Sequence, residues 1–344
     1  MNMKKWVEDI IKNPQKKAVP VLSFPCISLM GITVNELIND SGLQAKGMKL
    51  VADRVPTGAS VSMMDLSVEA EAFGSTIRFS DDEVPTVIGR IVEDEDDAEA
   101  LKVPEIGAGR TGKYIDAIEK VCGMITDRPV LAGIIGPFSL AGRLMDVSEA
   151  MINCYEEPDM VHTVMKKVTE FLVAYAKAYK SVGANGIVMA EPLTGLLSPD
   201  LAEEFSEPYV REIVDAVQDE NFAVIYHNCG NNVVRMVDSI ARIGADGYHF
   251  GNSIRMSDIV DKLPEDVLVM GNVDPAGQLR NGTPASVKAV TKEVMAECCD
   301  HPNFVISTGC DIPPASSWEN IDAFFEAVEE FYFEKKTGAV KMKA

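Results

Sequence analysis

The amino-acid sequence predicts an α/β fold, a (β/α)8 TIM barrel with an N-terminal helical extension, formed as one domain over residues 1–344. Three observations lead to this prediction. Short apolar runs rich in β-formers recur eight times, longer amphipathic stretches separate them, and the chain length suits one large barrel. Strands that alternate with helices form a parallel sheet, and eight such units favour closure into a barrel.

The predicted strands share a continuous apolar character that is typical of strands buried on both faces. In chain order they are Val19–Ser23, Ser60–Met64, Pro129–Ile135, Gly186–Ala190, Ala223–Tyr226, Gly247–Phe250, Val267–Gly271 and Phe304–Thr308. An open doubly wound sheet is the alternative architecture. No G-x-G-x-x-G motif follows the first strand, so the sequence gives no support for dinucleotide binding.

The stretches between the strands carry apolar residues at helical spacing. We expect an amphipathic helix within residues 1–17, and further helices over Met160–Val182 and Pro199–Val217. Two of the predicted helices run into a glycine, Gly183 and Gly244, shortly before the next strand. Glycine suits the left-handed position that ends many helices, which supports the alternation of helices and strands.

The composition excludes several classes of partner. Lys and Arg number 32 against 53 Asp and Glu, which gives a formal net charge of −21. Such a surface repels nucleic acid and anionic lipid. No apolar run approaches the roughly 18 residues that a membrane span needs, and the N-terminus lacks the apolar region of a signal peptide. We therefore expect a cytoplasmic protein without nucleic-acid or membrane partners, and the composition leaves its oligomeric state open.

The seven cysteines are scattered and show no disulfide framework. In a reducing compartment such thiols are free, buried or bound to metal. Cys122, Cys154, Cys298 and Cys299 lie in predicted helices, where we expect them to be core residues.

Residues suited to metal binding follow two of the predicted strands. Functional side chains of a barrel gather beyond the carboxyl ends of its strands. His227 and Cys229 follow the fifth strand and are two positions apart, so on extended backbone they point the same way. Cys310 follows the eighth strand. An imidazole and two thiolates would hold Zn²⁺ and leave one position open, as catalytic zinc requires. The alternative is that all three are core residues whose spacing is a coincidence.

A zinc site with two thiolates favours one kind of chemistry. Two anionic ligands make the metal a poorer Lewis acid for water, yet the metal still lowers the pKa of a bound thiol and keeps it a thiolate. Alkylation of a thiol is then more natural than hydrolysis.

Other polar residues also follow predicted strands. Glu191, after the fourth strand, is a candidate fourth ligand, acid–base group or substrate contact. Its alternative role is to stabilise the N-terminus of a helix. Asp65 and Asn272, after the second and seventh strands, are candidates for substrate binding, and Glu69 and Glu71 for the polar lining of the same mouth. His249, on the sixth strand, faces either the pocket or the surrounding helices.

Several segments together resemble the uroporphyrinogen decarboxylase superfamily, and specifically its cobamide-dependent methyltransferase branch, which includes methylcobamide:coenzyme M methyltransferases. The resemblance extends over nearly the whole chain. Its segments are Asp65–Gly74, Gly136–Gly142, Glu191-Pro192 with Leu197–Pro199, His227–Asn231, Gly271–Pro275, and Gly309-Cys310 followed by Pro313.

The resemblance implies a fold, a metal and a partner. The fold is a (β/α)8 barrel, and the zinc ligands fall on His227, Cys229 and Cys310. Zinc would activate a small thiol, such as coenzyme M or homocysteine, which takes a methyl group from a methylcobamide supplied by a separate corrinoid protein, with cobalt leaving as Co(I). Some relatives transfer the methyl group from a methylated substrate to the corrinoid instead. No Asp-x-His-x-x-Gly corrinoid motif is present in this sequence.

Two other functions remain open. The first is a porphyrinogen decarboxylase, although the stretch Pro20–Cys26 lacks the arginine-rich motif of such enzymes and the first arginine is Arg54. The second is a non-catalytic accessory protein that binds corrinoid or metal. After the sixth strand, many relatives carry an acidic residue where this chain has Phe250-Gly251-Asn252, which leaves the substrate of a methyltransferase open.

Overall fold

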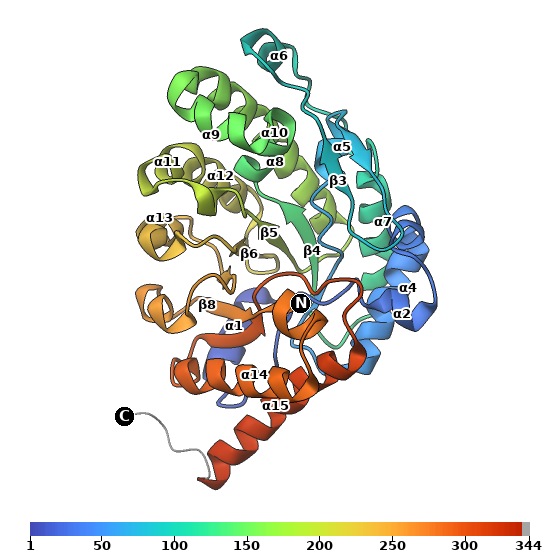
Figure 1. Cartoon of the computed structure of the whole chain (residues 1–344), viewed down its shortest axis with the longest axis vertical. Helices are drawn as coiled ribbons and strands as arrows, with labels where there is room; N and C mark the ends of the chain where they lie inside the picture. The colour runs from blue at the N-terminus through green and yellow to red at the C-terminus, as the bar shows by residue number, and fades with distance from the viewer. Residues whose placement is uncertain (339–344) are drawn as a thin grey trace.

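The computed structural model describes residues 1–338, and its centre is a curled parallel sheet of seven strands with helices outside it (Figure 1). The strand order is β1-β4-β5-β6-β7-β8-β9. These strands are β1 (Ser60–Val61), β4 (Val130–Ile135), β5 (Gly186–Ala190), β6 (Ala223–Asn228), β7 (Gly247–Phe250), β8 (Leu268–Val273) and β9 (Phe304–Thr308). Seven of the eight predicted strands are therefore confirmed, in an α/β fold of TIM-barrel-like type.

The first predicted strand, Val19–Ser23, is not a strand, so that part of the prediction is wrong. The segment still runs beside β9, where Val19 N–H donates to Ile306 O at 3.1 Å. Two features prevent a regular ladder. Pro20 has no N–H to donate, and Val21 N–H donates to the Thr308 side-chain hydroxyl at 3.3 Å instead of to a backbone carbonyl.

The helix predicted over Pro199–Val217 is two helices, α11 (Pro199–Phe205) and α12 (Glu207–Val217). Pro208 explains the break, because a proline inside a continuous helix would clash with the preceding turn and remove a hydrogen bond. The helix predicted over Met160–Val182 is α10 (Pro158–Ser181). Gly183 and Gly244 both have positive φ, which confirms that they end their helices in a left-handed conformation.

The N-terminal helix is shorter than predicted: α1 (Met3–Lys12) begins after Asn2, whose side chain accepts from Lys5 N–H. Met3 and Val7 are buried in an apolar cluster that includes residues from the amino-terminal halves of the strands, among them Ala223 and Leu268. Helix α1 therefore covers that end of the sheet.

The remaining helices are short or lie on the outside of the sheet. They are α2 (Cys26–Met30), α3 (Val34–Asn39), α4 (Ser41–Arg54), α5 (Val68–Ala72), α6 (Glu95–Ala100), α7 (Thr111–Cys122), α8 (Pro137–Met145), α9 (Val147–Glu156), α13 (Val237–Arg242), α14 (Pro284–Cys298) and α15 (Trp318–Thr337). A small antiparallel pair, β2 (Thr76–Arg78) and β3 (Thr86–Ile88), was not predicted from the sequence. Its side chains are exposed or half-buried, so it lacks the apolar run that marks the other strands.

Four cysteines were predicted to be core residues on helices. Cys154 and Cys298 are buried, whereas Cys122 and Cys299 are half-buried, and all four lie in or at the end of a helix. Over residues 1–338, no helix combines the length and the apolar composition needed to cross a membrane.

Candidate metal centre and substrate pocket

The structure brings together the three residues predicted to bind metal. His227 lies near the end of β6, Cys229 follows that strand directly, and Cys310 lies two residues beyond β9. The imidazole nitrogen and the two sulfurs all lie within 4.8 Å of one another. Strands β6 and β9 are separated in the sheet by β7 and β8, so it is the curl of the sheet that brings their carboxyl ends together.

Two glycines allow the loops that carry the cysteines to approach their neighbours. A Cβ atom on Gly251 would lie 2.5 Å from Cys229 Cα, and one on Gly309 would lie 2.7 Å from Asn252 N. Neither position can carry a side chain unless the backbone moves. A side chain at Gly251 would therefore displace Cys229.

The two thiols influence each other's ionisation. A hydrogen bond from Cys310 lowers the pKa of Cys229 to about 7, against the opposing effect of burial. The same hydrogen bond, together with burial, raises the pKa of Cys310 to about 12. Cys229 is the thiol that ionises first, and metal binding requires thiolates.

His227 is buried and has one free nitrogen. Its Nδ1 lies 2.7 Å from His249 Nδ1 and 3.2 Å from the His249 carbonyl oxygen. Its Nε2 is also buried, and within the described part of the chain it has no hydrogen-bond partner. Leaving such an atom unsatisfied costs about 1–3 kcal/mol. A metal ion between Nε2 and the two sulfurs would satisfy it.

This donor set fits zinc. Nitrogen and sulfur ligands are those that zinc prefers, and a tetrahedral zinc site spaces such atoms about 3.5–3.8 Å apart. The observed upper limit of 4.8 Å is close to that spacing. Three ligands leave one coordination position for a substrate.

His249 faces inward, beside His227, which answers a question that the sequence left open. The two histidines are direct neighbours in the register of β6 and β7. His249 Nε2 lies 2.8 Å from Ser307 Oγ, and Ser307 Oγ donates to Val19 O at 2.7 Å. Burial, reinforced by His227, lowers the pKa of His249 well below its usual range. The sequence did not single out Ser307, and its only signal was its place on a buried strand.

Glu191 lies at the N-terminus of helix α8 and is fully buried. Its carboxylate accepts from Phe138 N–H at 3.0 Å and from Ser139 N–H at 2.6 Å. The hydroxyls of Thr194 and Ser206 also donate to it, each at 3.1 Å. Burial raises its pKa and these hydrogen bonds oppose the shift. Glu191 is not part of the cluster that His227, Cys229 and Cys310 form among the described residues.

The two predicted substrate-binding residues are both engaged within the protein. Asp65 has a fully buried side chain that pairs with Arg110 and accepts from Tyr114 Oη at 3.0 Å. Asn272 Nδ2 donates to Gly251 O and to Ile254 O, each at 2.8 Å. Asn272 therefore ties the loop after β7 to the end of β8, next to the cysteine loop.

A pocket of about 350 Å³ opens at the same end of the strands. Its walls include Met64, which follows β1, and Asp311, the residue next to Cys310. Arg143 of α8 also lines it, and its Nε is buried without a hydrogen-bond partner from residues 1–338. No ion pair joins Arg143 to an acidic side chain of those residues. The sequence did not point to Arg143, because only the fold shows that no acidic side chain of residues 1–338 forms an ion pair with it, Asp65 acting on it from beyond ion-pair distance.

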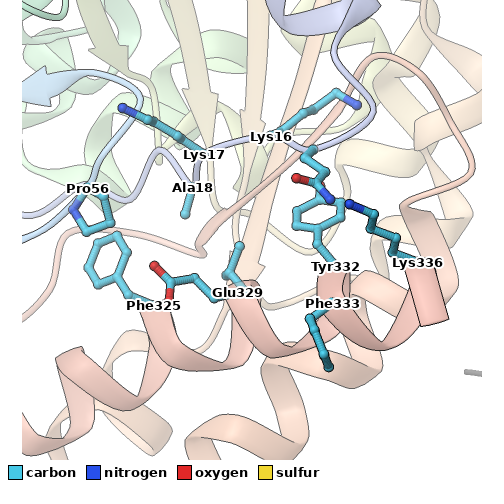
Figure 2. A pocket seen from close by; sticks show the side chains of 11 residues that line it. Lys16, Lys17, Ala18, Pro56, Phe325, Glu329, Tyr332, Phe333 and Lys336 are labelled. Atoms are coloured by element: carbon cyan, nitrogen blue, oxygen red, sulfur yellow. The ribbon is translucent and has the colours of Figure 1, made fainter. Parts of the chain in front are cut away.

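A second cavity, of about 440 Å³, lies elsewhere, between residues 15–18 and helix α15 (Figure 2). Figure 2 shows Tyr332 and Lys336 of α15 on one side and Lys17 with Ala18 on the other. Ala18 and Pro56 precede the first segments of the sheet, so this cavity lies at the amino-terminal end of the strands, opposite the cysteines. It is not part of the candidate metal centre.

Comparison with known proteins agrees with this architecture. A methylcobamide:CoM methyltransferase, MtbA, from Methanosarcina acetivorans is 29% identical over 276 residues, 78% of each chain. A uroporphyrinogen decarboxylase from Alcanivorax borkumensis is 26% identical over 289 residues, 81% of this chain and 80% of its own. The solved structure of a methyltransferase from Methanosarcina mazei has a TM-score of 0.83 at 24% identity and covers 96% of this chain and 99% of its own.

The last of these comparisons demonstrates a common fold. A B12-independent methionine synthase from Shewanella sp. W3-18-1 shares it more distantly, with a TM-score of 0.59 at 12% identity over 95% of this chain and 99% of its own. The family model described as uroporphyrinogen decarboxylase (URO-D) matches residues 13–331. The chain therefore belongs to the uroporphyrinogen decarboxylase family.

Proposed function

We propose that this protein is a corrinoid-dependent methyltransferase, which moves a methyl group between a methylated corrinoid on a partner protein and a small thiol. Zinc held by His227, Cys229 and Cys310 would activate the thiol. One observation carries this proposal: a ring nitrogen of His227 lies within 4.8 Å of two thiols, on an imidazole whose buried Nε2 has no hydrogen-bond partner among residues 1–338. The sequence likeness to methylcobamide:CoM methyltransferases supports it.

Zinc bound by two thiolates and one imidazole would bind the substrate sulfur at its open position and hold it as a thiolate. The residues of this chain prepare for that role. Cys229, with a pKa of about 7, is ready to ionise near neutral pH, and Cys310 loses its proton when metal binds. The buried surroundings of His227 exclude water from its Nε2.

The pocket that Asp311, the residue after Cys310, helps to line supports a small, anionic thiol as substrate. Arg143 offers a guanidinium group that pairs with no carboxylate of residues 1–338, in a pocket of about 350 Å³. A guanidinium binds sulfonate and carboxylate groups well. Coenzyme M carries a sulfonate and homocysteine a carboxylate, so both fit this chemistry. We propose that Asp65, which accepts hydrogen bonds from Ser67 of the pocket lining, holds that wall in place for this substrate, and that Asn272 holds the loop next to Cys229.

Two roles were open for Glu191, and its surroundings favour one of them. Its four hydrogen bonds would have to break before it could act as a fourth ligand or as an acid–base group. We therefore propose that Glu191 stabilises the N-terminus of α8, where two backbone N–H groups meet its carboxylate.

We further propose that residues 18–22 complete the sheet as an irregular eighth member, between β9 and β1, in one barrel domain. Gly58 N–H donates to Ala18 O at 2.8 Å and Val19 N–H to Ile306 O at 3.1 Å, which supports this closure. The corrinoid protein would dock over the carboxyl end of the strands, in the cytoplasm. Residues 339–344 lie outside the described residues.

Methyl transfer to thiols tests the proposed activity. Purified, zinc-loaded protein is mixed anaerobically with methylcobalamin and coenzyme M, homocysteine or 2-mercaptoethanol, and the absorbance of cob(I)alamin is followed. We expect methylation of at least one thiol at a rate well above the uncatalysed reaction. Decarboxylation of uroporphyrinogen, without thiol methylation, would support the other activity known in the family. The absence of both reactions would favour an accessory protein.

A further inference from the structure

We propose that His249 is a positioning residue for the metal centre. It fixes the tautomer of His227, so that Nε2 of His227 keeps a free electron pair that faces the two cysteines. This inference rests on the proposed zinc site. Its evidence is a line of hydrogen bonds that runs from the backbone of Val19 through Ser307 and His249 to His227.

The line begins at a carbonyl group, which can only accept. Ser307 Oγ lies 2.7 Å from Val19 O and donates its single proton there. Only lone pairs of the hydroxyl oxygen then remain for His249 Nε2, at 2.8 Å. His249 Nε2 must therefore carry a hydrogen atom.

The proton on Nε2 determines the other nitrogen of His249. In a neutral imidazole one nitrogen donates and the other accepts, so His249 Nδ1 is an acceptor. It lies 2.7 Å from His227 Nδ1. Since two acceptors cannot share a hydrogen bond, His227 Nδ1 carries the proton. The His249 carbonyl oxygen, 3.2 Å away, favours the same arrangement because it too can only accept.

A proton on His227 Nδ1 leaves Nε2 with a free electron pair. This nitrogen is the buried atom that lacks a partner within residues 1–338, and its ring belongs to the cluster with Cys229 and Cys310. The opposite tautomer would place a proton on Nε2 and prevent coordination. Partners of this kind are known to orient metal-binding histidines and to set their tautomers.

A neutral imidazole also suits the charge of this site. Zn²⁺ with two thiolates is formally neutral, and a neutral partner for His227 adds no charge to a buried site. A carboxylate, a common partner of metal-binding histidines, would introduce one more buried negative charge. His249 supplies the same acceptor without that cost.

The zinc affinity of histidine variants, measured by competition with a chromophoric chelator, tests the inference. A variant of a histidine outside the site serves as the control. His249→Phe fills a similar volume but offers no acceptor, and we expect its zinc affinity to fall about 10- to 100-fold. His249→Asn keeps an oxygen acceptor near the position of Nδ1 and should recover most of this loss. His301→Ala removes a histidine outside the site and should bind zinc like the wild type. Unchanged affinity in His249→Phe would overturn the inference.

Imidazole ¹⁵N NMR measures directly which ring nitrogen carries the proton. If His249 only filled space, it would not determine the tautomer of His227. The chain has four histidines, so the spectrum is simple enough to assign with single variants. We expect the Nδ1–H form for His227 and the Nε2–H form for His249, with and without metal. The opposite tautomer for His227 or for His249, in the metal-free or the zinc-bound protein, would overturn the inference. A wild-type protein that binds no zinc would instead overturn the proposed function, while the metal-free spectrum still decides which tautomer His249 imposes.

Discussion

Gly251 and Cys229 pack so closely that a Cβ atom on Gly251 would lie 2.5 Å from Cys229 Cα. The loop after β7 thus forms the wall against which the cysteine loop rests, and Asn272 holds this wall through hydrogen bonds to Gly251 O and Ile254 O. The position of Cys229, one proposed zinc ligand, therefore depends on Gly251 having no side chain.

We predict that Gly251→Ala displaces Cys229 and lowers zinc affinity. Overpacking of this kind typically costs about 1–3 kcal/mol of stability as well. Gly123→Ala is a matched control, because a Cβ there meets only Lys120 O, at 3.4 Å. Zinc titration and thermal unfolding of both variants measure the two effects. Wild-type zinc affinity in Gly251→Ala would show that the close packing of Gly251 is not needed for metal binding.

Arg143→Met should distinguish anionic from neutral thiols. The guanidinium has no carboxylate partner within residues 1–338, so its loss leaves no buried charge unpaired and the free energy of unfolding should change little. Hydrogen bonds to a charged group contribute about 1.5–3 kcal/mol, which corresponds to a rise in KM of roughly 10- to 100-fold for an anionic thiol. Steady-state kinetics with coenzyme M and with 2-mercaptoethanol, which lacks the anionic group, provide the comparison. An equal effect on both thiols would contradict an anion-binding role.

Glu191→Gln should lower stability and leave zinc binding intact. The amide group of glutamine replaces one carboxylate oxygen with an NH2 donor, which would face either Ser139 N–H, the donor to Oε1, or Phe138 N–H and the two hydroxyls that donate to Oε2. Unsatisfied donors of this kind cost about 1–3 kcal/mol, which urea unfolding can measure. Loss of zinc at unchanged stability would instead support Glu191 as a metal ligand.

We predict that the free energy of unfolding depends on pH through the ionisation of Glu69. Burial raises the pKa of Glu69 from its ordinary value of 4.5 to about 7, although Ile135 N–H donates to its carboxylate. Between these pH values the folded protein holds a proton that the unfolded chain has released. The contribution of Glu69 to the free energy of unfolding therefore falls as pH rises from 4.5 to 7, by about 3 kcal/mol in total.

Glu69→Gln removes that ionisation and keeps an oxygen acceptor for Ile135. We expect the variant to exceed the wild type in stability at pH 8, and this advantage to shrink greatly at pH 5. Urea unfolding of both proteins at the two pH values measures the difference. A stability difference that is the same at pH 5 and pH 8 would show that Glu69 does not titrate in this range.

The sequence predicted the strands well because most of them are buried on every side and read as continuous apolar runs. The same criterion failed for Val19–Ser23, where Pro20 and the Thr308 hydroxyl interrupt the ladder. It also missed β2 and β3, whose residues are partly exposed. The spacing of His227 and Cys229 and the position of Cys310 were sufficient to predict their convergence, since the ends of parallel strands meet at one edge.

The surroundings of the site could not be predicted in the same way. Whether His249 faces His227 depends on the register of β6 against β7, which pairs them directly. That Arg143 forms no ion pair within residues 1–338 depends on the position of every acidic side chain that could reach it. The role of Glu191 depends on helix α8, whose first residues lie about 50 positions earlier in the chain but meet its carboxylate in space.

The zinc content of the purified protein tests the central claim most directly. Wild type, Cys310→Ser and the control Cys122→Ser, which changes a cysteine at the end of α7, are purified without chelator from zinc-supplemented cultures and measured by plasma mass spectrometry. We predict about one zinc per chain in the wild type and in Cys122→Ser, and its loss in Cys310→Ser. A wild-type protein without zinc, or a Cys310→Ser protein with unchanged zinc, would contradict the assignment of His227, Cys229 and Cys310 as a metal centre.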